Sequence, residues 1–590
     1  MNPRTLLNKR HQDALDLLSS ALRRDSAYEE LSAADLASYS PKPAAGWMTT
    51  VCVKNAAMRL DVVITETFPD DPPSIYIAGK GVDLFLKNPH VEETGKICTI
   101  PESAAINANL PVELFRYSVD AAIKILTNEI EQDFLDEFTS YWSRSQGTGK
   151  REFLVVDPPS AFGATATAAI CGAKVLIGAS YDSIRQWAEH SGDKLNDIGK
   201  PRICHVVSFG SPLLPKDFPG TINDLRTLLK ANSADQADLL DLHLCESNEY
   251  LALLFVQRTP HGDALAGILT KGYGLSQDHT LSDGFRLGHV PQKLLFARAT
   301  TKLEKGLLER ANAQRVDHEW IHTRGGVGAE LSGASVCVIG CGSLGSYVAH
   351  LLAKAGIGRL TLIDPQLMEW ANVGRHLLGA SDVGASKAEA IRKRIQLDHP
   401  HLSIRAILRD WRAWAKESDD PFGGFDLVVS TIADWRHERS LNLLARSLPF
   451  PPVVFGWMEP FALAGHALTV TGGGGCLECG MNGFGQFEDR VLVLDNATLK
   501  KEPGGCAYYQ EYGPLRLVPC ATLVAEAAVK AMNAPLDSSE IATIIGDLGL
   551  LSDCVGGVSK AWEKKLTPQL AEQIIIQKWS INPICPLCSA

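Results

Sequence analysis

Apolar and polar positions follow two different rhythms over the first quarter of the chain. Residues 11–24 carry apolar side chains at helical spacing, which predicts an amphipathic opening helix. Short apolar runs then predict three neighbouring strands, at 48–54, 58–65 and 74–78. Two further helices are predicted, at 119–130 and 133–142. The pattern indicates an α+β domain over 1–145.

The middle of the chain alternates apolar runs with amphipathic stretches. Strands are predicted at 153–156, 175–177, 204–208 and 250–257. Helices are predicted at 183–190, 222–231 and 293–305. This alternation predicts an α/β domain over 146–310. Because it has no phosphate loop, metal-ligand spacing or catalytic constellation, we interpret it as a scaffold that positions partner proteins. One interpretation of this scaffold is a degenerate relative of the C-terminal domain described next.

A buried strand predicted at 336–339 leads into Gly340, Gly342 and Gly345 and then into a helical stretch. Glycines in this G-x-G-x-x-G spacing let the backbone approach a phosphate, and the helix N-terminus favours its negative charge. The next apolar strand ends at Asp364, nineteen residues after Gly345. A carboxylate there can accept hydrogen bonds from ribose hydroxyls. Together these features predict a nucleotide site, and a dinucleotide dehydrogenase would look the same up to this point.

The residues after Asp364 separate the alternatives. Asn372, Arg375 and Lys387 place an amide and two cations beyond the acidic strand end. Cations in this position suit a triphosphate better than a nicotinamide. A further buried strand ends in Asp434, whose carboxylate is a suitable ligand for Mg²⁺. The sequence therefore favours an ATP site over a dinucleotide site.

Two C-x-x-C pairs lie near the C-terminal end of the chain. The first is formed by Cys476 and Cys479, and the second by Cys585 and Cys588. Each pair offers two thiolates at a tight turn, and two pairs complete a tetrahedral Cys₄ zinc site. Because such a site has no open position, we expect it to be structural and to pin residues 585–588 to the domain. The alternative is two redox pairs or loose thiols.

Composition narrows the classes of function. The 590 residues carry a formal net charge of −11 and no long basic run, which argues against nucleic-acid binding. No apolar stretch is long enough to span a membrane, and no signal-peptide pattern is visible at the N-terminus, so we expect a cytoplasmic protein. Fourteen cysteines in such a chain indicate thiols, nucleophiles or metal ligands rather than disulfides.

The C-terminal motifs resemble the ThiF/MoeB/ubiquitin-activating superfamily over roughly 311–590. That family adenylates the C-terminal glycine of a ubiquitin-like or sulfur-carrier protein, on a Rossmann-like fold with ATP and Mg²⁺. The resemblance implies the phosphate loop for the three glycines, the ribose contact for Asp364 and the Mg²⁺ ligand for Asp434. It implies contacts around the triphosphate for Asn372, Arg375 and Lys387. The family usually has glutamine after the arginine, where this chain has His376.

The same resemblance points to a nucleophilic cysteine. In the family this residue precedes a Gly-Pro pair and then a helix that contains Glu-Ala. Cys506 precedes Gly513-Pro514 and Glu526-Ala527 in that order, so we assign it as the nucleophile of the activating domain. Cys520 is the alternative, but its surroundings predict a helix start and core packing.

The N-terminal pattern resembles a ubiquitin-conjugating domain: a strand meander, a Pro-Pro turn, a polar loop and then Gly-x-Ile-Cys. By this likeness Cys98 is the transfer cysteine, which receives an acyl group as a thioester. The family's His-Pro-Asn triplet corresponds to Asn88-Pro89-His90, so His90 stands where the family has its oxyanion-stabilising asparagine. A histidine N–H can also donate to an oxyanion, although a packing role for His90 is an equal alternative.

A conjugating-like domain followed by an activating-like domain resembles the fused proteins of bacterial CBASS anti-phage operons. The resemblance implies an α/β multidomain protein that adenylates a partner's C-terminal glycine, forms a thioester on Cys506, transfers it to Cys98 and ligates it to an amine. It also implies a cGAS-like nucleotidyltransferase as the modified partner and a homodimer built on the activating domains. Two alternatives stay open: an adenylyltransferase for a sulfur-carrier protein, which leaves Cys98 without a role, and a binding scaffold with inactive sites.

Overall fold

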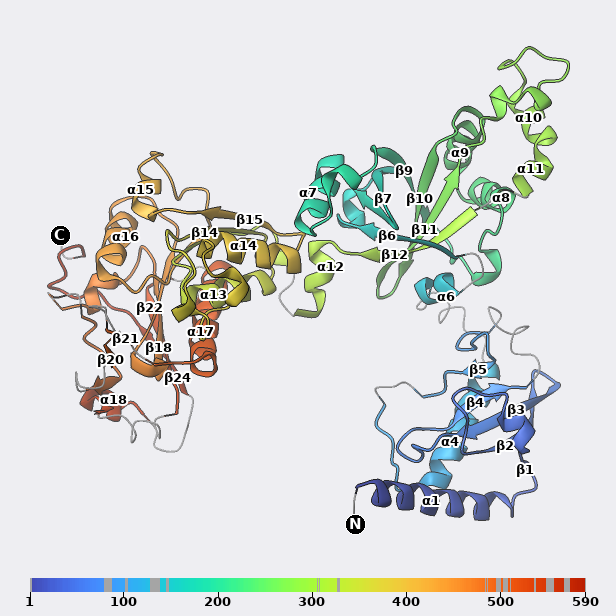
Figure 1. The fold of residues 1–590 in the computed structure, drawn as a ribbon, viewed down its shortest axis with the longest axis horizontal. Coiled ribbons are helices and arrows are strands. Elements are labelled where there is room, and N and C mark those ends of the chain that lie inside the picture. Colours follow the sequence, from blue (N-terminus) through green and yellow to red (C-terminus); the bar gives the residue numbers. More distant parts are fainter. Residues whose placement is uncertain are drawn as a thin grey trace.

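The computed structural model describes most of the chain in three units, which Figure 1 shows one after another along the molecule. The described residues are 3–78, 88–100, 104–127, 138–144, 148–304, 306, 308–325, 329–482, 484, 486–494, 500–501, 508–509, 511–534, 537–547, 556–566 and 573–588. None of the helices in these ranges has both the length and the apolar character needed to cross a bilayer.

The N-terminal unit is built on an antiparallel sheet with the strand order β1-β2-β3-β4-β5. The strands are β1 (Tyr28–Glu30), β2 (Ala45–Val53), β3 (Ala56–Ile64), β4 (Ser74–Ile77) and β5 (Lys96–Ile97). The helices are α1 (Pro3–Leu22), α2 (Ala33–Leu36) and α4 (Pro111–Thr127). Leu18 of α1 and Phe115 of α4 pack with Leu60 and Ile75 of the sheet in one core. The predicted opening helix and three predicted strands are therefore confirmed.

The middle unit is a closed barrel with the strand order β10-β11-β12-β6-β8-β7-β9. The strands are β6 (Thr148–Val155), β7 (Thr165–Cys171), β8 (Lys174–Gly178), β9 (Arg202–Phe209), β10 (Tyr250–Thr259), β11 (Gly262–Lys271) and β12 (Leu308–Arg315). The helices are α6 (Phe138–Arg144), α7 (Tyr181–His190), α8 (Ile222–Asn232), α9 (Ala234–Glu246), α10 (Gln292–Arg298) and α11 (Thr300–Glu304). Both parallel and antiparallel pairs occur in the barrel. A degenerate doubly wound adenylation domain would have an open, mainly parallel sheet, so that interpretation of the middle region is wrong.

Helix α6 belongs to the barrel rather than to the N-terminal sheet. Its Trp142 is fully buried and donates a hydrogen bond from Nε1 to the carbonyl oxygen of Ala311 in β12, at 3.0 Å. At the other end, β12 runs five residues past the expected boundary at 310. The barrel therefore takes in residues on both sides of the expected range.

The C-terminal unit is an eight-stranded sheet with the order β15-β14-β13-β16-β17-β18-β22-β24. The strands are β13 (Ser335–Ile339), β14 (Arg359–Ile363), β15 (Ser403–Ile407), β16 (Leu427–Ser430), β17 (Val453–Met458), β18 (Ala464–Val470), β22 (Glu540–Ile545) and β24 (Gln573–Lys578). The helices are α12 (His318–His322), α13 (Ser343–Lys354), α14 (Lys387–Asp398), α15 (Trp411–Ala415), α16 (Trp435–Ser447), α17 (Pro514–Asn533) and α18 (Lys560–Glu563). Two short strand pairs complete it: β19 (Leu492–Leu494) with β23 (Gly556–Val558), and β20 (Lys500–Lys501) with β21 (Tyr508–Tyr509).

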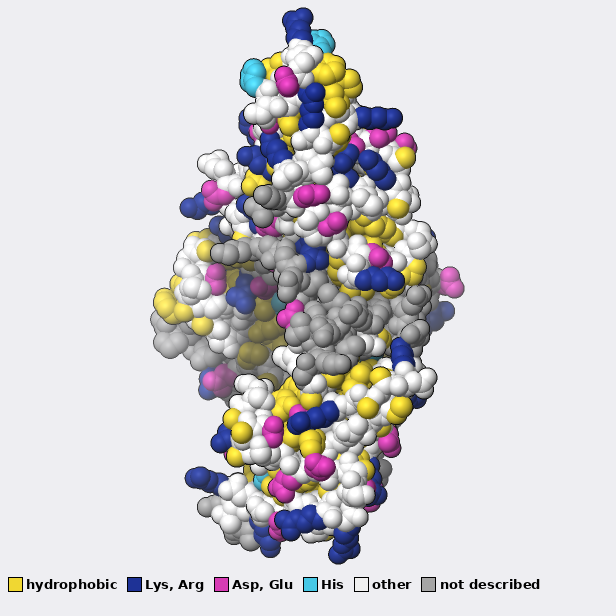
Figure 2. All heavy atoms as spheres, turned by 90° about the vertical axis from the view of Figure 1, so that its right-hand side faces the viewer, with side chains coloured by type: hydrophobic (Ala, Val, Ile, Leu, Met, Phe, Trp, Pro, Cys, Tyr) yellow, Lys and Arg dark blue, Asp and Glu magenta, His cyan; other side chains and the backbone are white. Residues whose placement is uncertain are grey.

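The first five strands of this order are parallel and the remaining pairs are antiparallel. The chain passes from β13 to β14 on one side and returns to β16 on the other, so β13 marks the point where the strand order reverses. Ligands of open α/β sheets bind at such a point, beyond the carboxyl ends of the strands. On the face drawn in Figure 2, Lys and Arg side chains are interspersed with Asp and Glu.

Candidate functional site

The glycine loop after β13 is tight at two positions and open at the third. Gly340 has a φ of +93°, and a Cβ there would lie 3.0 Å from the backbone of Thr431 and Ile432. A Cβ on Gly345 would lie 1.9 Å from the carbonyl oxygen of Gly340. Gly342 caps the N-terminus of α13, and a Cβ there would meet nothing within 4 Å. The loop therefore offers open backbone at Gly342, where a phosphate can approach the helix N-terminus.

A cavity of about 250 Å³ lies beside this loop, at the carboxyl ends of the parallel strands. Gly340 and Gly342 line it together with three carboxylates, Asp364, Asp410 and Asp434. These carboxylates follow β14, β15 and β16, so neighbouring strands bring them to one edge of the sheet. The sequence analysis missed Asp410. Its signal is the one shared by the other two, a carboxylate shortly after a buried strand.

Asp364 is buried and braces the backbone on both sides of the cavity. Its Oδ2 accepts a hydrogen bond from the backbone N–H of Cys341, and its Oδ1 accepts one from that of Gln366, both at 2.7 Å. A carboxylate has about four acceptor positions, so each oxygen keeps capacity for a ribose hydroxyl. The contact to Cys341 also holds the glycine loop against the end of β14.

Asp434 is the N-cap of α16 and accepts a hydrogen bond from the backbone N–H of Arg436. The Arg436 guanidinium lies 2.7 Å from its Oδ2 and lowers the pKa of Asp434 to about 2. The hydrogen bond from Arg412 likewise lowers the pKa of Asp410 to about 2. Both carboxylates are ionised near neutral pH, as ligands for a hard divalent cation must be. Because the Arg436 side chain is 81% exposed, it can leave Asp434 at little cost.

The expected triphosphate residues are not gathered in one cavity. Asn372 accepts a hydrogen bond from the backbone N–H of Glu369 at 3.0 Å, so its amide shapes a turn. Lys387 is buried at the start of α14 and donates to Oε1 of Gln366 at 2.8 Å. Gln366 itself lines the cavity. Lys387 thus contacts a residue that lines the cavity, Gln366, and does not line the cavity itself. Asn372 shapes the turn that carries Arg375.

His376, which stands where the resembling family has glutamine, braces the glycine loop. It is buried, its Nε2–H donates to the carbonyl oxygen of Cys341 at 2.8 Å, and its Nδ1 accepts from the backbone N–H of Leu378 at 3.1 Å. Burial lowers the pKa of His376, so the neutral ring keeps one donor and one acceptor. His376 therefore joins the glycine loop at Cys341 to the backbone at Leu378.

Arg375 lines a second cavity, of about 630 Å³, with residues 511–516 at the start of α17. Its guanidinium lies over the ring of Tyr512, with Cζ 5.3 Å from the ring centroid. The Tyr512 hydroxyl is 2.8 Å from Oγ of Ser343, the first residue of α13. Tyr512 therefore links the glycine loop to the segment that follows residue 506. The sequence analysis did not identify it.

Cys506 lies outside the described residues. Cys520 lies in α17, where it is buried among the side chains that pack on the sheet. Burial raises the pKa of the Cys520 thiol to about 12, so it is a poor nucleophile. The prediction that Cys520 belongs to the core is confirmed.

Cys98 immediately follows β5 and is exposed. Its Sγ lies 3.7 Å from Oε1 of Glu92, and its backbone N–H donates to the carbonyl oxygen of His90 at 2.8 Å. His90 adopts a φ of +60°, a left-handed conformation that histidine and asparagine tolerate better than most residues. The backbone N–H of His90 is held by the hydroxyl of Tyr141 at 2.7 Å. The structure therefore brings His90 beside Cys98 and adds Glu92, which the sequence analysis did not single out.

A groove of about 290 Å³ begins next to Cys98, at Thr99 and Ile100. Its wall includes Leu110 and Tyr117, which are 47% and 64% exposed. Exposed apolar side chains beside an exposed thiol provide a surface for an extended peptide.

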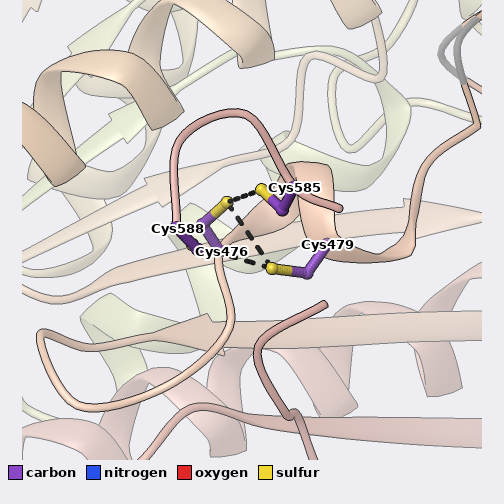
Figure 3. A group of neighbouring side chains, drawn as sticks. All are labelled: Cys476, Cys479, Cys585 and Cys588. Atoms are coloured by element: carbon purple, nitrogen blue, oxygen red, sulfur yellow. Dashed lines mark hydrogen bonds between the residues drawn. The ribbon is translucent and has the colours of Figure 1, made fainter. Parts of the chain in front are cut away.

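Cys476, Cys479, Cys585 and Cys588 converge from two loops, as Figure 3 shows. Sγ of Cys476 lies 4.0 Å from that of Cys479 and 3.6 Å from that of Cys585, and Sγ of Cys479 lies 3.7 Å from that of Cys588. Four thiolates bound tetrahedrally at about 2.3 Å from a metal ion are about 3.8 Å apart. The predicted ligand set is therefore assembled with the spacing that a closed tetrahedral metal site needs.

Two protein families match separate parts of the chain. Residues 322–551 match the ThiF family, and residues 24–148 match prokaryotic E2 family B. The ATP-dependent ubiquitin transferase-like protein Cap2 of Pseudomonas aeruginosa is 32% identical over 164 residues, which are 27% of this chain and 28% of that protein. A sulfur carrier protein adenylyltransferase of Thermus thermophilus is 26% identical over 269 residues, which are 44% of this chain and 83% of that protein. Among solved structures, a complex of E. coli MccB aligns with 51% of this chain and 83% of its own at 19% identity, with a TM-score of 0.32.

Proposed function

We propose that this chain, which joins a prokaryotic E2 family B domain to a ThiF-family domain, activates the C-terminal carboxylate of a partner protein and ligates it to an amine. The observation that carries the proposal is the exposed thiol of Cys98, beside an apolar groove, on the same polypeptide as an ATP-type cavity. An adenylating domain alone has no use for an exposed thiol beside a groove on a separate domain.

The first step is adenylation at the cavity beside the glycine loop. The partner's carboxylate attacks the α-phosphorus of ATP, and pyrophosphate leaves with its electron pair. Asp364 receives the ribose hydroxyls, the N–H groups at Gly342 face the phosphates, and Arg375 and Lys387 offset negative charge. Asp434, with Asp410 beside it, would hold Mg²⁺, which neutralises charge on the triphosphate. The cavity that Arg375 shares with residues 511–516 suits the partner's C-terminal tail, because it adjoins the phosphate loop through Tyr512.

Formation of a thioester and then one thioester exchange follow. The thiolate of Cys506 attacks the carbonyl carbon of the acyl adenylate, and AMP leaves. The thiolate of Cys98 then attacks that thioester and releases the Cys506 thiolate. Finally an amine of the target, such as a lysine, attacks the Cys98 thioester, loses a proton and releases the Cys98 thiolate. In this proposal Glu92, whose Oε1 lies 3.7 Å from Sγ of Cys98, accepts that proton or orients the amine, and His90 donates to the oxyanion.

The sequence resemblance adds finer proposals. The modifier is a cGAS-like nucleotidyltransferase with a C-terminal glycine, the setting is anti-phage defence, and the active form is a homodimer through the ThiF-family domains. Cap2 of Pseudomonas aeruginosa is named as ubiquitin transferase-like, which agrees with the type of reaction.

Replacing Cys98 by serine tests the relay. Serine holds the acyl group as an ester, which is more stable than a thioester, so the intermediate is expected to accumulate. The variant is purified from its native host with the neighbouring genes present, and the peptide that contains position 98 is analysed by mass spectrometry. A branched peptide that carries another protein's C-terminal residues is the expected result. Cys52→Ser, at another exposed cysteine of the same domain, is the matched control and is expected to stay unmodified.

The second candidate function is adenylation of a sulfur-carrier protein. The match to the Thermus thermophilus adenylyltransferase favours it, because it spans 83% of that protein. In that case position 98 of the serine variant stays unmodified, and Cys506 carries a persulfide in the wild-type protein. Both marks are read in the same peptide analysis, so one experiment separates the two functions.

Zinc is the ion that we propose for the four-cysteine site, because a closed all-thiolate tetrahedron favours it. Cys479→Ser is expected to remove about one zinc per chain and to lower the thermal unfolding midpoint by several degrees, since residues 585–588 lose their anchor. Metal analysis and a thermal melt measure both effects, with Cys52→Ser as the control. Retention of the full zinc content by the variant would contradict the assignment.

A further inference from the structure

Histidines gather where the barrel meets the ThiF-family domain. Helix α12, which begins three residues after the last barrel strand, carries His318 and His322 one turn apart. His401 lies in the turn between α14 and β15, and His399 lies two residues before it. The ring centroids of His318, His322 and His401 are 4.5, 5.1 and 5.3 Å apart in pairs. None of these residues has a role in the function proposed above.

Three of the rings present nitrogen atoms to a common point. One ring nitrogen from each of His318, His322 and His401 lies within 4.8 Å of the other two. Nε2 of His322 and Nε2 of His401 are 3.0 Å apart. Imidazole nitrogens bound tetrahedrally at 2.0–2.1 Å from a zinc ion are about 3.3 Å apart. A small movement of His318 is enough to complete three corners of such a site.

Backbone carbonyls orient two of these rings. Nε2–H of His318 donates to the carbonyl oxygen of Gly356 at 2.8 Å, which leaves Nδ1 with a lone pair. The ring of His322 makes its own hydrogen bond to the backbone of Lys354, which leaves Nε2 with a lone pair toward His401. Metal-binding histidines are held by this kind of contact from their second nitrogen.

Several ring nitrogens of the cluster lack another use. Nδ1 of His318, Nδ1 of His401 and Nε2 of His399 are buried and have no hydrogen-bond partner in the part of the chain that the structure describes. A buried ring nitrogen without a partner is unfavourable, and a cation bound to Nδ1 of His318 or to Nε2 of His399 removes that cost.

We propose that His318, His322 and His401 bind a zinc ion that holds α12, the helix that follows the last barrel strand, against the turn between α14 and β15. Imidazole ligands suit zinc, and His399 or water supplies the fourth position. The middle unit also contacts the turn between α14 and β15 directly, because Nδ1–H of His190 in α7 donates to the carbonyl oxygen of Pro400 at 2.9 Å. The ion therefore sits beside the direct contact between the two units.

The site is structural rather than hydrolytic. His318 to His322 reads His-Glu-Trp-Ile-His, which matches the H-E-x-x-H pattern of zinc peptidases, whose glutamate is a general base. Here Glu319 is 55% exposed and its carboxylate lies 3.4 Å from the guanidinium of Arg315, outside the ligand group. No base is placed at the ion.

Zinc analysis of the full-length protein, purified with a tag that contains no histidine, tests the proposal. We expect about two zinc ions per chain in the wild type, one for each ligand group, and about one in His401→Gln and in His318→Gln. His289→Gln, at an exposed position of the middle unit, is the matched control and is expected to keep both ions. Circular dichroism checks that each variant is folded.

Cobalt titration of the chelator-treated wild type gives an independent reading that needs no variant. The four-cysteine site is expected to give intense sulfur-to-cobalt charge-transfer absorption that saturates at one equivalent. The histidine site is expected to add a second equivalent with ligand-field bands only. A wild type that binds a single equivalent, or histidine variants that keep the second one, would overturn the proposal, and this holds whether or not the chain ligates a partner.

Discussion

Replacing Cys98 by alanine is expected to reduce ligation by at least about 10³-fold while ATP–pyrophosphate exchange stays within about twofold of wild type. The reason is the separation of the two chemistries in the fold. Cys98 lies on the N-terminal unit after β5, whereas the glycine loop and its carboxylates lie at the edge of the C-terminal sheet. Removing the thiol therefore blocks the second thioester without touching adenylation. Ligation is followed by gel shift of the modifier, and exchange by labelled pyrophosphate.

Cys52→Ala is the matched control for this experiment, because Cys52 is an exposed thiol in the same unit. It is expected to ligate normally. If Cys98→Ala also ligates, the acyl group passes directly from the activating domain to the amine, and the N-terminal unit serves only to bind the target. If exchange falls together with ligation, the two units depend on each other in a way that the separate cavities do not explain.

The parts of the fold that were predictable are those set by local pattern. Short apolar runs located β2, β3 and β4 of the N-terminal sheet, helical spacing located α1, and the glycine spacing located the turn between β13 and α13. The four cysteines were recognisable because each C-x-x-C pair is a complete half-site within four residues. In all these cases the sequence signal itself is local, although Cys476 and Cys585, for example, are separated by 109 positions.

The parts that were missed depend on contacts between distant segments. Closure of the barrel requires β12 to pair with both β6 and β11, and no residue near β12 signals that pairing. Tyr512 reaches Ser343 across 169 positions, and His401 reaches His322 across 79. The sequence analysis singled out none of the three histidines, because only the fold brings His401 beside α12.

A valine at Gly342 is expected to lower ATP–pyrophosphate exchange by about 10²-fold or more while the thermal unfolding midpoint stays unchanged. Gly342 has a φ of −73°, which valine adopts readily, and a Cβ there meets no protein atom within 4 Å. The side chain would instead enter the cavity, where it keeps the phosphates from the N–H groups of α13. Gly210→Val, at an open position after β9, is the matched control and is expected to change neither quantity.

Gly345→Ala is expected to behave in the opposite way, and the contrast separates a ligand effect from a folding effect. Its Cβ would lie 1.9 Å from the carbonyl oxygen of Gly340 and 2.4 Å from Oγ1 of Thr431, so the loop itself must move. We expect the free energy of unfolding to fall by about 1–3 kcal/mol, together with a loss of exchange.

A Gly342→Val protein that keeps full exchange would show that the nucleotide does not lie against this loop. A destabilised Gly342→Val protein would show that protein atoms pack against Gly342, in contrast to the open geometry described here. The assignment of this cavity as the triphosphate site would then be wrong.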